Sequence, residues 1–245
     1  MAKKKKTKKE IIREYVKSIL IALIAAMFIK IFVIASYAIP TGSMKDTLLI
    51  GEALFANQFI YGVRTPSRIP LINMKIPYAK LPTLKQPQRG DIIIFKYPKD
   101  DKLNYVKRCI ALPGETIEIR NGDVYLDGKP EGKKEFMKRE YDPTEERYCL
   151  YYQMTLDSGK KYTIRHYDGL IRRHDNFGPI KVPESHYFMM GDNRDNSEDS
   201  RAWGFLPHEN ILGKPLIIYW SWDKNVPLYK FFNKIRWKRI ANLIS

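Results

Sequence analysis

The chain has 245 residues, of which 44% are hydrophobic and 13% aromatic, so it holds enough apolar material for a packed core. This composition excludes an intrinsically disordered protein. The formal net charge of +16 would ordinarily suit a nucleic-acid partner.

The positive charge is concentrated at the two ends of the chain. Residues 1–18 carry eight Lys or Arg against two acids, a net charge of +6, and residues 228–245 carry five against none, a net charge of +5. Both basic ends adjoin apolar residues, which favours an anionic lipid surface as the partner. In the central region the aromatic residues do not interleave with a basic patch, so no nucleic-acid partner is expected.

Two cysteines and four histidines are scattered along the chain without metal-ligand spacing. Cys109 and Cys149 form no C-x-x-C pair, and their spacing leaves a disulfide and two free buried thiols equally open. We therefore expect neither a metal nor any other cofactor.

The N-terminal region divides into a basic tail, residues 1–17, and an apolar segment, residues 18–38. About 20 residues of helix cross the hydrocarbon core of a bilayer, so this segment can span it if Lys30, which interrupts the apolar run, is tolerated. The lysine cluster would keep the N-terminus in the cytoplasm and place the rest of the chain outside. Residues 36–38 (SYA) also match a cleavage signal, so a removable signal peptide is the alternative, although Lys30 is unusual in such a peptide.

A polar turn follows the apolar segment, in the sequence YAIPTGSMKDTLLIG of residues 37–51. Pro, Gly and Ser are ordinary turn formers, so Ser43 can be explained as a turn residue alone. The alternative is that Ser43 is a nucleophile held at the membrane surface. A serine hydroxyl is unreactive until a base takes its proton, so this hypothesis needs a partner elsewhere in the chain.

Strand patterns predominate in residues 39–227, which we interpret as one extracytoplasmic domain. Short runs rich in Ile, Val, Tyr or Trp predict strands at residues 91–97, 104–112, 187–190 and 215–222. Residues 115–126 alternate about Asn121-Gly122, the strongest short hairpin signal, and residues 61–89 predict an extended, Pro-rich loop. Long amphipathic helices are absent from this region, so the sequence predicts a mostly β fold, an antiparallel barrel or sandwich.

A lysine lies inside the strand predicted at residues 104–112. If that strand alternates, Lys107 shares a face with Tyr105, and its neighbour Arg108 lies on the other face. Burial lowers the pKa of a lysine by up to about 3–5 units, which makes the neutral amine available near neutral pH. Lys107 is therefore a candidate base for Ser43, although charges that protect an edge strand from aggregation give the same pattern. A histidine base is a further alternative, but none of the four histidines lies in a recognisable catalytic motif.

The run GDNRDNSEDSR, residues 191–201, follows an apolar strand abruptly. These residues form turns readily, so a plain solvated loop would explain them. Arg194 and Arg201 among the aspartates can instead form a bidentate ion-pair network that makes the loop rigid. A rigid loop can hold Ser197 in one rotamer against the amine of Lys107.

The last segment, residues 228–245, places apolar residues at helical spacing with basic residues between them. It predicts a short amphipathic helix. Such a helix would either lie on acidic lipid or pack on the domain with its basic face in solvent, and both interpretations stay open.

Taken together, the apolar segment and residues 39–51, 90–115 and 188–205 resemble the type I signal peptidases, membrane-anchored Ser-Lys proteases, in the order of that family's motifs. The GDNRDNSEDSR run is the most specific of these. The resemblance implies that Ser43 is the nucleophile, that Lys107 is the general base, and that the Ser43 N–H and the Thr41 hydroxyl bind the oxyanion. It implies further roles for two groups of residues: Ser197, Asp192, Asp199 and Arg201 orient the base or support the site, and Ile39, Pro40, Met44, Leu48, Tyr105 and Val106 line the substrate cleft.

Two regions depart from the family pattern or lie outside it. Asp46 stands where the family often has proline, which concerns the geometry of a turn and not a reacting group. Residues 131–185 contain no motif of the family and predict a variable β extension.

The resemblance implies a membrane-bound serine endopeptidase that removes signal peptides from exported preproteins after small residues, at Ala-x-Ala sites. It implies a single-pass protein of the bacterial cytoplasmic membrane whose partners are preproteins, the lipid bilayer and, transiently, the export machinery. Two alternatives remain. One is a related Ser-Lys processing peptidase with a narrower set of substrates, and the other is a membrane-anchored β domain that binds proteins without catalysis.

Overall fold

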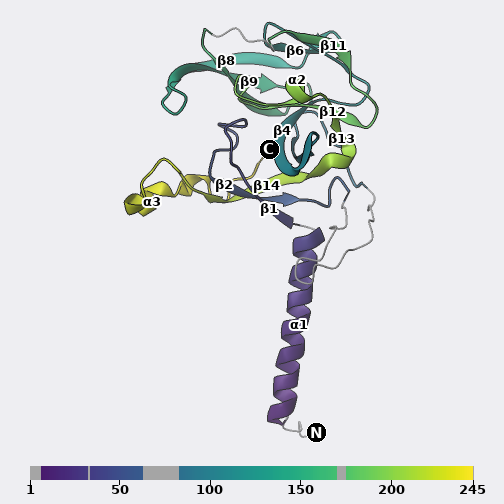
Figure 1. Cartoon of the computed structure of the whole chain (residues 1–245), viewed down its shortest axis with the longest axis vertical. Helices are drawn as coiled ribbons and strands as arrows, with labels where there is room; N and C mark the ends of the chain where they lie inside the picture. Colours follow the sequence, from purple (N-terminus) through teal and green to yellow (C-terminus); the bar gives the residue numbers. More distant parts are fainter. Residues whose placement is uncertain (1–6, 33, 63–82, 170–174, 245) are drawn as a thin grey trace.

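The computed structural model describes residues 7–32, 34–62, 83–169 and 175–244, so most of the loop predicted at residues 61–89 lies outside the described residues. A long N-terminal helix stands away from a β domain and adjoins it only at the helix's C-terminal end (Figure 1).

Helix α1 (Lys8–Phe32) begins and ends earlier than the apolar segment predicted at residues 18–38. A capping box fixes its start: the Glu10 carboxylate accepts a hydrogen bond from the Thr7 N–H (2.8 Å), and the Glu10 N–H donates to the Thr7 hydroxyl (3.3 Å). Strand β1 (Ile34–Ala38) pairs with the next strand instead of continuing the helix, so the helix itself ends before residue 38.

The apolar part of α1 is uncovered. Five of its side chains are more than half exposed, namely Ile19, Leu20, Ile21, Leu23 and Ile24. Judged by length and hydropathy, none of the helices in the described ranges qualifies as a membrane-crossing helix. The placement expected for the Lys30 side chain lies outside the described residues.

Seven antiparallel strands form the main sheet of the β domain. In spatial order they are β1, β2 (Glu52–Asn57), β14 (Ile211–Ser221), β3 (Ile92–Tyr97), β4 (Asp100–Ala111), β12 (His186–Met190) and β13 (Leu206–Pro207). Within the described residues the two outermost strands, β1 and β13, do not pair with each other. The predicted antiparallel β fold is therefore confirmed, whereas the predicted barrel is wrong because the sheet does not close.

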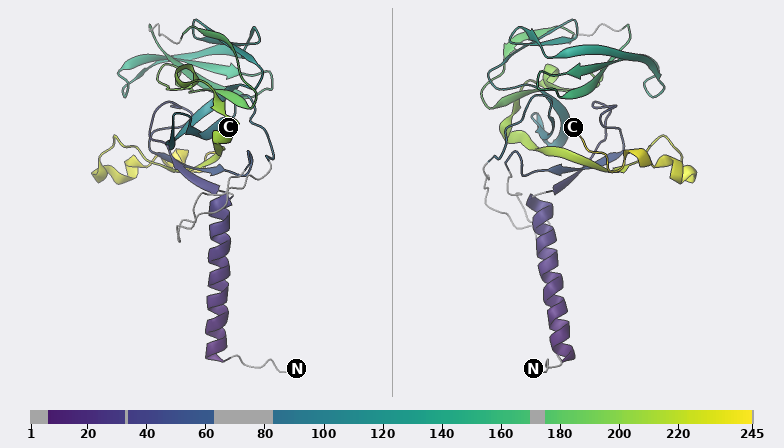
Figure 2. Two further views of the ribbon diagram at one scale, coloured as in Figure 1. Left: turned by 45° about the vertical axis from the view of Figure 1, so that its right-hand side comes forward. Right: turned by 180° about the vertical axis from the view of Figure 1, so that it is seen from behind.

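Two smaller antiparallel sheets lie on the side of the domain farther from α1 (Figures 1 and 2). One contains β11 (Phe177–Lys181), β5 (Thr116–Arg120), β6 (Asp123–Leu126) and β7 (Lys129–Pro130), and the other contains β10 (Lys161–Tyr167), β9 (Arg147–Thr155) and β8 (Lys133–Asp142). Asn121 and Gly122 form the predicted tight turn between β5 and β6, with φ values of 50° and 83°. The region 131–185, expected as a β extension, supplies strands β8 to β11.

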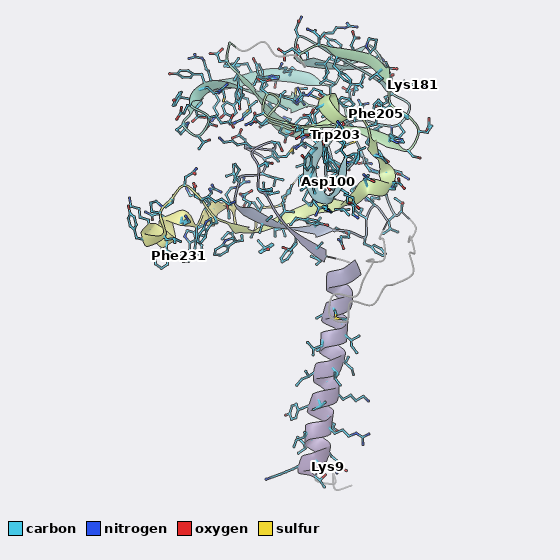
Figure 3. The ribbon with its side chains drawn as sticks, in the orientation of Figure 1. Lys9, Asp100, Lys181, Trp203, Phe205 and Phe231 are labelled. Atoms are coloured by element: carbon cyan, nitrogen blue, oxygen red, sulfur yellow. The ribbon has the colours of Figure 1, made fainter. Side chains whose placement is uncertain are left out.

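Strand β3 is buried on both faces, which explains its uninterrupted apolar sequence. Ile93 packs on one face with Trp203 of the short helix α2 (Ser200–Trp203), which lies inside the domain in Figure 3. Ile92 and Ile94 pack on the other face, beneath the turn that joins β1 to β2. The 3₁₀ turn η1 (His208–Asn210) leads into β14. Both cysteines are buried and free, which answers the question that their spacing left open.

The C-terminal segment is not the single amphipathic helix predicted at residues 228–245. It contains three short helical pieces, η2 (Leu228–Lys230), α3 (Phe231–Lys234) and η3 (Trp237–Arg239). Between them Ile235 has an extended backbone (φ −85°, ψ 122°), is 4% exposed and pairs with Trp222. Burial and strand-like pairing of Ile235 thus interrupt the helix. We call residues 222–244 the C-terminal arm; it projects sideways from the domain, with Phe231 near its tip (Figures 2 and 3).

Candidate active site

A compact turn, residues 42–49, connects β1 to β2 and presents Ser43; we call it the serine turn. Its helical hydrogen bond runs from the Leu48 N–H to the Met44 carbonyl (2.7 Å). Met44 and Leu48 are 2% and 0% exposed and pack in the core beneath the turn. Because the two apolar anchors follow the serine closely, Ser43 is held in place at 9% exposure.

Lys107 reaches the serine from strand β4. Its Nζ lies 2.6 Å from Ser43 Oγ, within hydrogen-bond distance, and the lysine is only 3% exposed. Burial lowers the pKa of Lys107 to about 8, although the negative charges of Asp199, Glu198 and Asp192 oppose the shift. A lysine with this pKa supplies a neutral amine near neutral pH, and that amine can take the proton of the Ser43 hydroxyl.

Ser43 and Lys107 share a cleft of about 250 Å³. Its other lining residues are Ala38, Ile39, Pro40, Thr41, Gly42, Met44, Asn104, Tyr105, Val106, Asn196 and Glu198. Of the residues predicted to line the cleft, Leu48 alone is not in its wall: it is 0% exposed and supports the serine turn from below. The polar lining residues Asn104, Asn196 and Glu198 were not predicted to line the cleft. Only their closeness in sequence to Tyr105 and Ser197 could have indicated that they do.

Most charged side chains of the loop 191–201 are buried and paired, which makes the loop rigid, but most of their partners lie outside it. The Asp192 carboxylate accepts two hydrogen bonds from Arg108 of β4 (2.8 and 2.7 Å), and both side chains are 1% exposed. Asp192 also accepts a hydrogen bond from the Thr47 hydroxyl (2.6 Å). It thereby ties the strand of Lys107 to the serine turn.

The two arginines of the loop differ in where their partners lie. Arg201 donates two hydrogen bonds of 2.8 Å to the Asp199 carboxylate, which is the pairing expected within the loop. Arg194 instead lies 3.7 Å from Glu131, and Asp195 accepts from the Tyr167 N–H (2.6 Å). The predicted ion-pair network within the loop is thus correct for Arg201 and wrong for Arg194. The partner of Arg194 is Glu131, which lies in a segment without a motif, so nothing in the sequence indicated this pair.

Asp199 is a buried anion next to Lys107. Burial alone would raise its pKa, but the hydrogen bonds and charge of Arg201 bring that pKa below its ordinary value, with help from the Gly191 N–H and the Ser197 hydroxyl. Within the described residues the structure gives no direct hydrogen bond from Ser197 to Lys107. Instead Ser197 packs tightly against Gly191, where an added Cβ would stand 2.3 Å from Ser197 Oγ and 2.5 Å from the Ser43 carbonyl oxygen.

A sequence profile described as signal peptidase, peptidase S26, matches residues 12–220 of this chain. The chain belongs to the signal peptidase family. Signal peptidase I of Pseudomonas fluorescens is 34% identical over 231 residues, which cover 90% of this chain and 76% of that protein. Signal peptidase I of Aquifex aeolicus is 32% identical over 237 residues, 85% of this chain and 84% of that protein. A crystal structure of a signal peptidase I from Enterococcus faecalis V583 is 32% identical, covers 53% of this chain and 97% of that one, and has a TM-score of 0.32.

Family membership confirms the resemblance found in the sequence, and with it the activity. The protein is a serine endopeptidase, a type I signal peptidase that cleaves signal peptides. Its cleft therefore belongs to an enzyme, and the alternative of a non-catalytic binding domain is set aside.

In this signal peptidase the serine turn departs from the family at Asp46. Its φ is 78°, in the left-handed region, which proline cannot adopt because its ring holds φ near −65°. Burial raises the pKa of the Asp46 carboxyl group, which lies 3.7 Å from the guanidinium of Arg165. An ion-pair partner of Arg165 thus stands where the resemblance led us to expect proline.

Arg165 of β10 is the centre of an ionic cluster beside the serine turn. It is 1% exposed and donates hydrogen bonds to Asp142 (2.6 Å) and to Glu145, which flank the connection between β8 and β9. Lys45 of the serine turn donates to the same Asp142 carboxylate. The β extension therefore braces the catalytic turn, a role that no motif in residues 131–185 could have revealed.

Asn193 holds the backbone around Ser43. Its N–H donates to the Ser43 carbonyl (3.1 Å), and its side-chain amide donates to the Gly42 carbonyl (3.2 Å). Asn193 lies inside the motif GDNRDNSEDSR, but its role could not be predicted because its partners, which include the Glu145 carboxylate, are far away in sequence.

The C-terminal arm contacts the other side of the same turn. Arg239 donates to the Thr47 carbonyl (2.8 Å) and pairs with Glu52, which is 0% exposed, at 2.7 and 3.0 Å. Arg236 donates to the carbonyl of Ile50 (3.0 Å). The serine turn is therefore bonded on one side to the loop 191–201 and the β extension and on the other to the end of the chain.

The described histidines contact other groups. His166 lies 3.6 Å from Asp195, and burial lowers its pKa; His208 lies 3.2 Å from the Tyr187 hydroxyl, and His186 2.8 Å from the Glu184 carbonyl. None of these three lines the cleft, and the fourth, His174, lies outside the described residues. In the described part of the chain no three His, Cys, Asp or Glu side chains gather as metal ligands would.

Proposed function

We propose that Ser43 and Lys107 carry out signal-peptide cleavage as nucleophile and general base. The observation that supports this most directly is the 2.6 Å separation of Ser43 Oγ and Lys107 Nζ inside a cleft. The neutral amine removes the hydroxyl proton as Oγ attacks the scissile carbonyl, and the resulting ammonium returns the proton to the leaving amine. Water then hydrolyses the acyl-enzyme through the same amine.

The oxyanion of the tetrahedral intermediate would be bound by the Ser43 N–H and the Thr41 hydroxyl. Thr41 lines the same cleft as the nucleophile, and its hydroxyl can rotate toward the oxyanion. One such donor contributes about 3 kcal/mol of transition-state stabilisation in serine proteases. Thr41→Val should therefore lower kcat more than it raises KM.

We expect the preprotein to lie extended between residues 38–40 and the middle of β4 at Tyr105 and Val106. Alternate side chains of an extended chain point the same way, so the first and the third residue before the scissile bond would face the apolar wall. Ile39, Met44 and Val106 form part of this wall, which we expect to accept small side chains, as an Ala-x-Ala site requires.

We propose that the enzyme works at the bacterial cytoplasmic membrane, anchored in a single pass by the apolar part of α1 with its N-terminus in the cytoplasm. The C-terminal arm supports this placement. Its most exposed apolar side chains, which lie beside the basic residues of the tail, are Leu228 (71%), Tyr229 (81%), Phe232 (75%), Trp237 (59%) and Leu243 (80%). An active site near the bilayer would meet cleavage sites as preproteins leave the export machinery.

The test is incubation of detergent-solubilised protein with a preprotein that carries an Ala-x-Ala site. We expect Ser43→Ala and Lys107→Ala to lose cleavage while their thermal unfolding stays cooperative. Matched controls are Ser158→Ala and Lys161→Ala, which change an exposed serine and an exposed strand lysine and should cleave normally. Full activity of Lys107→Ala would remove Lys107 as the base. A panel of other precursor proteins would reveal the alternative of a narrower processing peptidase.

A further inference from the structure

One wall of the cleft carries a carboxylate that the cleavage mechanism does not use. Glu198 is exposed, and its two oxygens accept hydrogen bonds from the hydroxyls of Tyr97 (2.8 Å) and Tyr105 (3.3 Å). The two tyrosine rings stack with centroids 4.5 Å apart and an interplanar angle of 13°. The carboxylate is therefore held in a fixed orientation by two strands, and each oxygen keeps a lone pair for another donor.

The other charged side chains in and near the cleft are already paired, which leaves the Glu198 carboxylate available to pair with a charge on a bound peptide. Among its described lining residues only Lys107 and Glu198 are charged side chains, and Lys107 is 3% exposed and already bonded to Ser43. The nearby arginines are engaged elsewhere, Arg108 with Asp192 and Arg201 with Asp199. An extended peptide in the cleft would thus meet one accessible charge, which is negative.

The position of Glu198 along the cleft limits which substrate residue it reaches. Its partner Tyr105 precedes Lys107 by two residues in β4, which is about 7 Å along the strand. A peptide that runs beside β4 advances at the same rate. Its side chain opposite Glu198 therefore lies within about three residues of the scissile bond.

We propose that Glu198 is a specificity-determining residue that selects preproteins with a lysine or arginine within about three residues of the cleavage site; this inference rests on the proposed function of the cleft. The cation would pair with the Glu198 carboxylate, and this charged hydrogen bond favours a cation over a neutral side chain of the same length. An acidic side chain at the same position would be disfavoured.

The test compares peptides with one Ala-x-Ala site that differ only at one position, scanned over three residues on each side of the scissile bond. Each position carries Lys, Gln or Glu, and kcat/KM is measured at low and at high salt. At one position we expect wild type to prefer Lys over Gln by about three- to fivefold, the size of an exposed ion pair, with Glu below Gln and the preference weaker at high salt. Glu198→Gln should bring the Lys/Gln ratio close to one, whereas the control Glu209→Gln, at an exposed carboxylate outside this cleft, should keep it.

Two outcomes would overturn the inference: no Lys preference in wild type at any position, or a preference that survives in Glu198→Gln. A change in Glu198→Gln that is equal for all peptides and moves only the pH profile would also overturn it, because it would show that Glu198 acts on Lys107 alone. Fluorescence-monitored binding of the same peptides to Ser43→Ala tests recognition without cleavage. If the peptides bind with a Lys preference but the wild-type enzyme cleaves none of them, the proposed catalysis is refuted and the role of Glu198 stands.

Discussion

The pH dependence of cleavage follows from the burial of Lys107. With a pKa of about 8, about 10% of the lysine is neutral at pH 7, about half at pH 8 and about 90% at pH 9. If the neutral amine is the base, kcat/KM should rise about tenfold between pH 7 and pH 9 and then level off. A solvent-exposed lysine would be about 0.03% neutral at pH 7, and the rate would keep rising about tenfold per pH unit to beyond pH 10.

The assay is cleavage of a fluorogenic Ala-x-Ala peptide by detergent-solubilised protein between pH 6 and pH 10.5, at substrate concentrations far below KM so that the free enzyme is titrated. Near-UV circular dichroism at each pH controls for unfolding. Two results would refute the reasoning: a flat profile, which would mean that no lysine titrates in the rate-limiting step, or a rise that continues past pH 10, which would mean that Lys107 is not desolvated.

Three further predictions concern the same site. Lys107→Met should be inactive, yet its free energy of unfolding at pH 7, measured by urea titration, should be about 2 kcal/mol higher than that of wild type. Burial of the charged lysine costs the wild type about 3 kcal/mol, and the hydrogen bond that the variant loses contributes about 1 kcal/mol. This gain should fade as the pH rises from about 8 to above 10, where the lysine is neutral in both states. Gly191→Ala should reduce kcat at least about 100-fold with little change in KM, because its Cβ would stand 2.5 Å from the Ser43 carbonyl oxygen and displace the nucleophile; wild-type kcat would contradict this packing. Asp46→Pro, which introduces the residue that the resemblance led us to expect, should lower both activity and melting temperature because the φ of 78° excludes proline. Asp46→Gly should instead raise the melting temperature by a few degrees. An Asp46→Pro protein as active and stable as wild type would show that the turn adopts a conformation that proline can occupy.

The closeness of Ser43 and Lys107, the proposed catalytic pair, could be predicted because its signals are local. The alternation of side chains in the strand predicted at residues 104–112 puts Lys107 and Arg108 on opposite faces. In the structure Lys107 is hydrogen-bonded to Ser43, and Arg108 is hydrogen-bonded to Asp192. The central strands and the hairpin at Asn121-Gly122 likewise follow from short-range patterns of apolar and turn residues.

The supports of the site could not be predicted because their partners are distant in sequence. Asp142, Glu145 and Arg165 lie in a segment without a motif, and only the folded arrangement of β8, β9 and β10 brings them to the serine turn. The same holds for the C-terminal arm: its helical spacing is real, but pairing of Ile235 with Trp222 outweighs the propensity of the local sequence.

The bonds from Arg236 and Arg239 to the serine turn have a consequence for proteolysis. Two carbonyls near position 50 obtain their donors from the C-terminal arm. A protease that cut the arm ahead of Arg236 would remove both donors and leave these carbonyls to water. Trimming of the arm would therefore loosen the backbone next to Ser43.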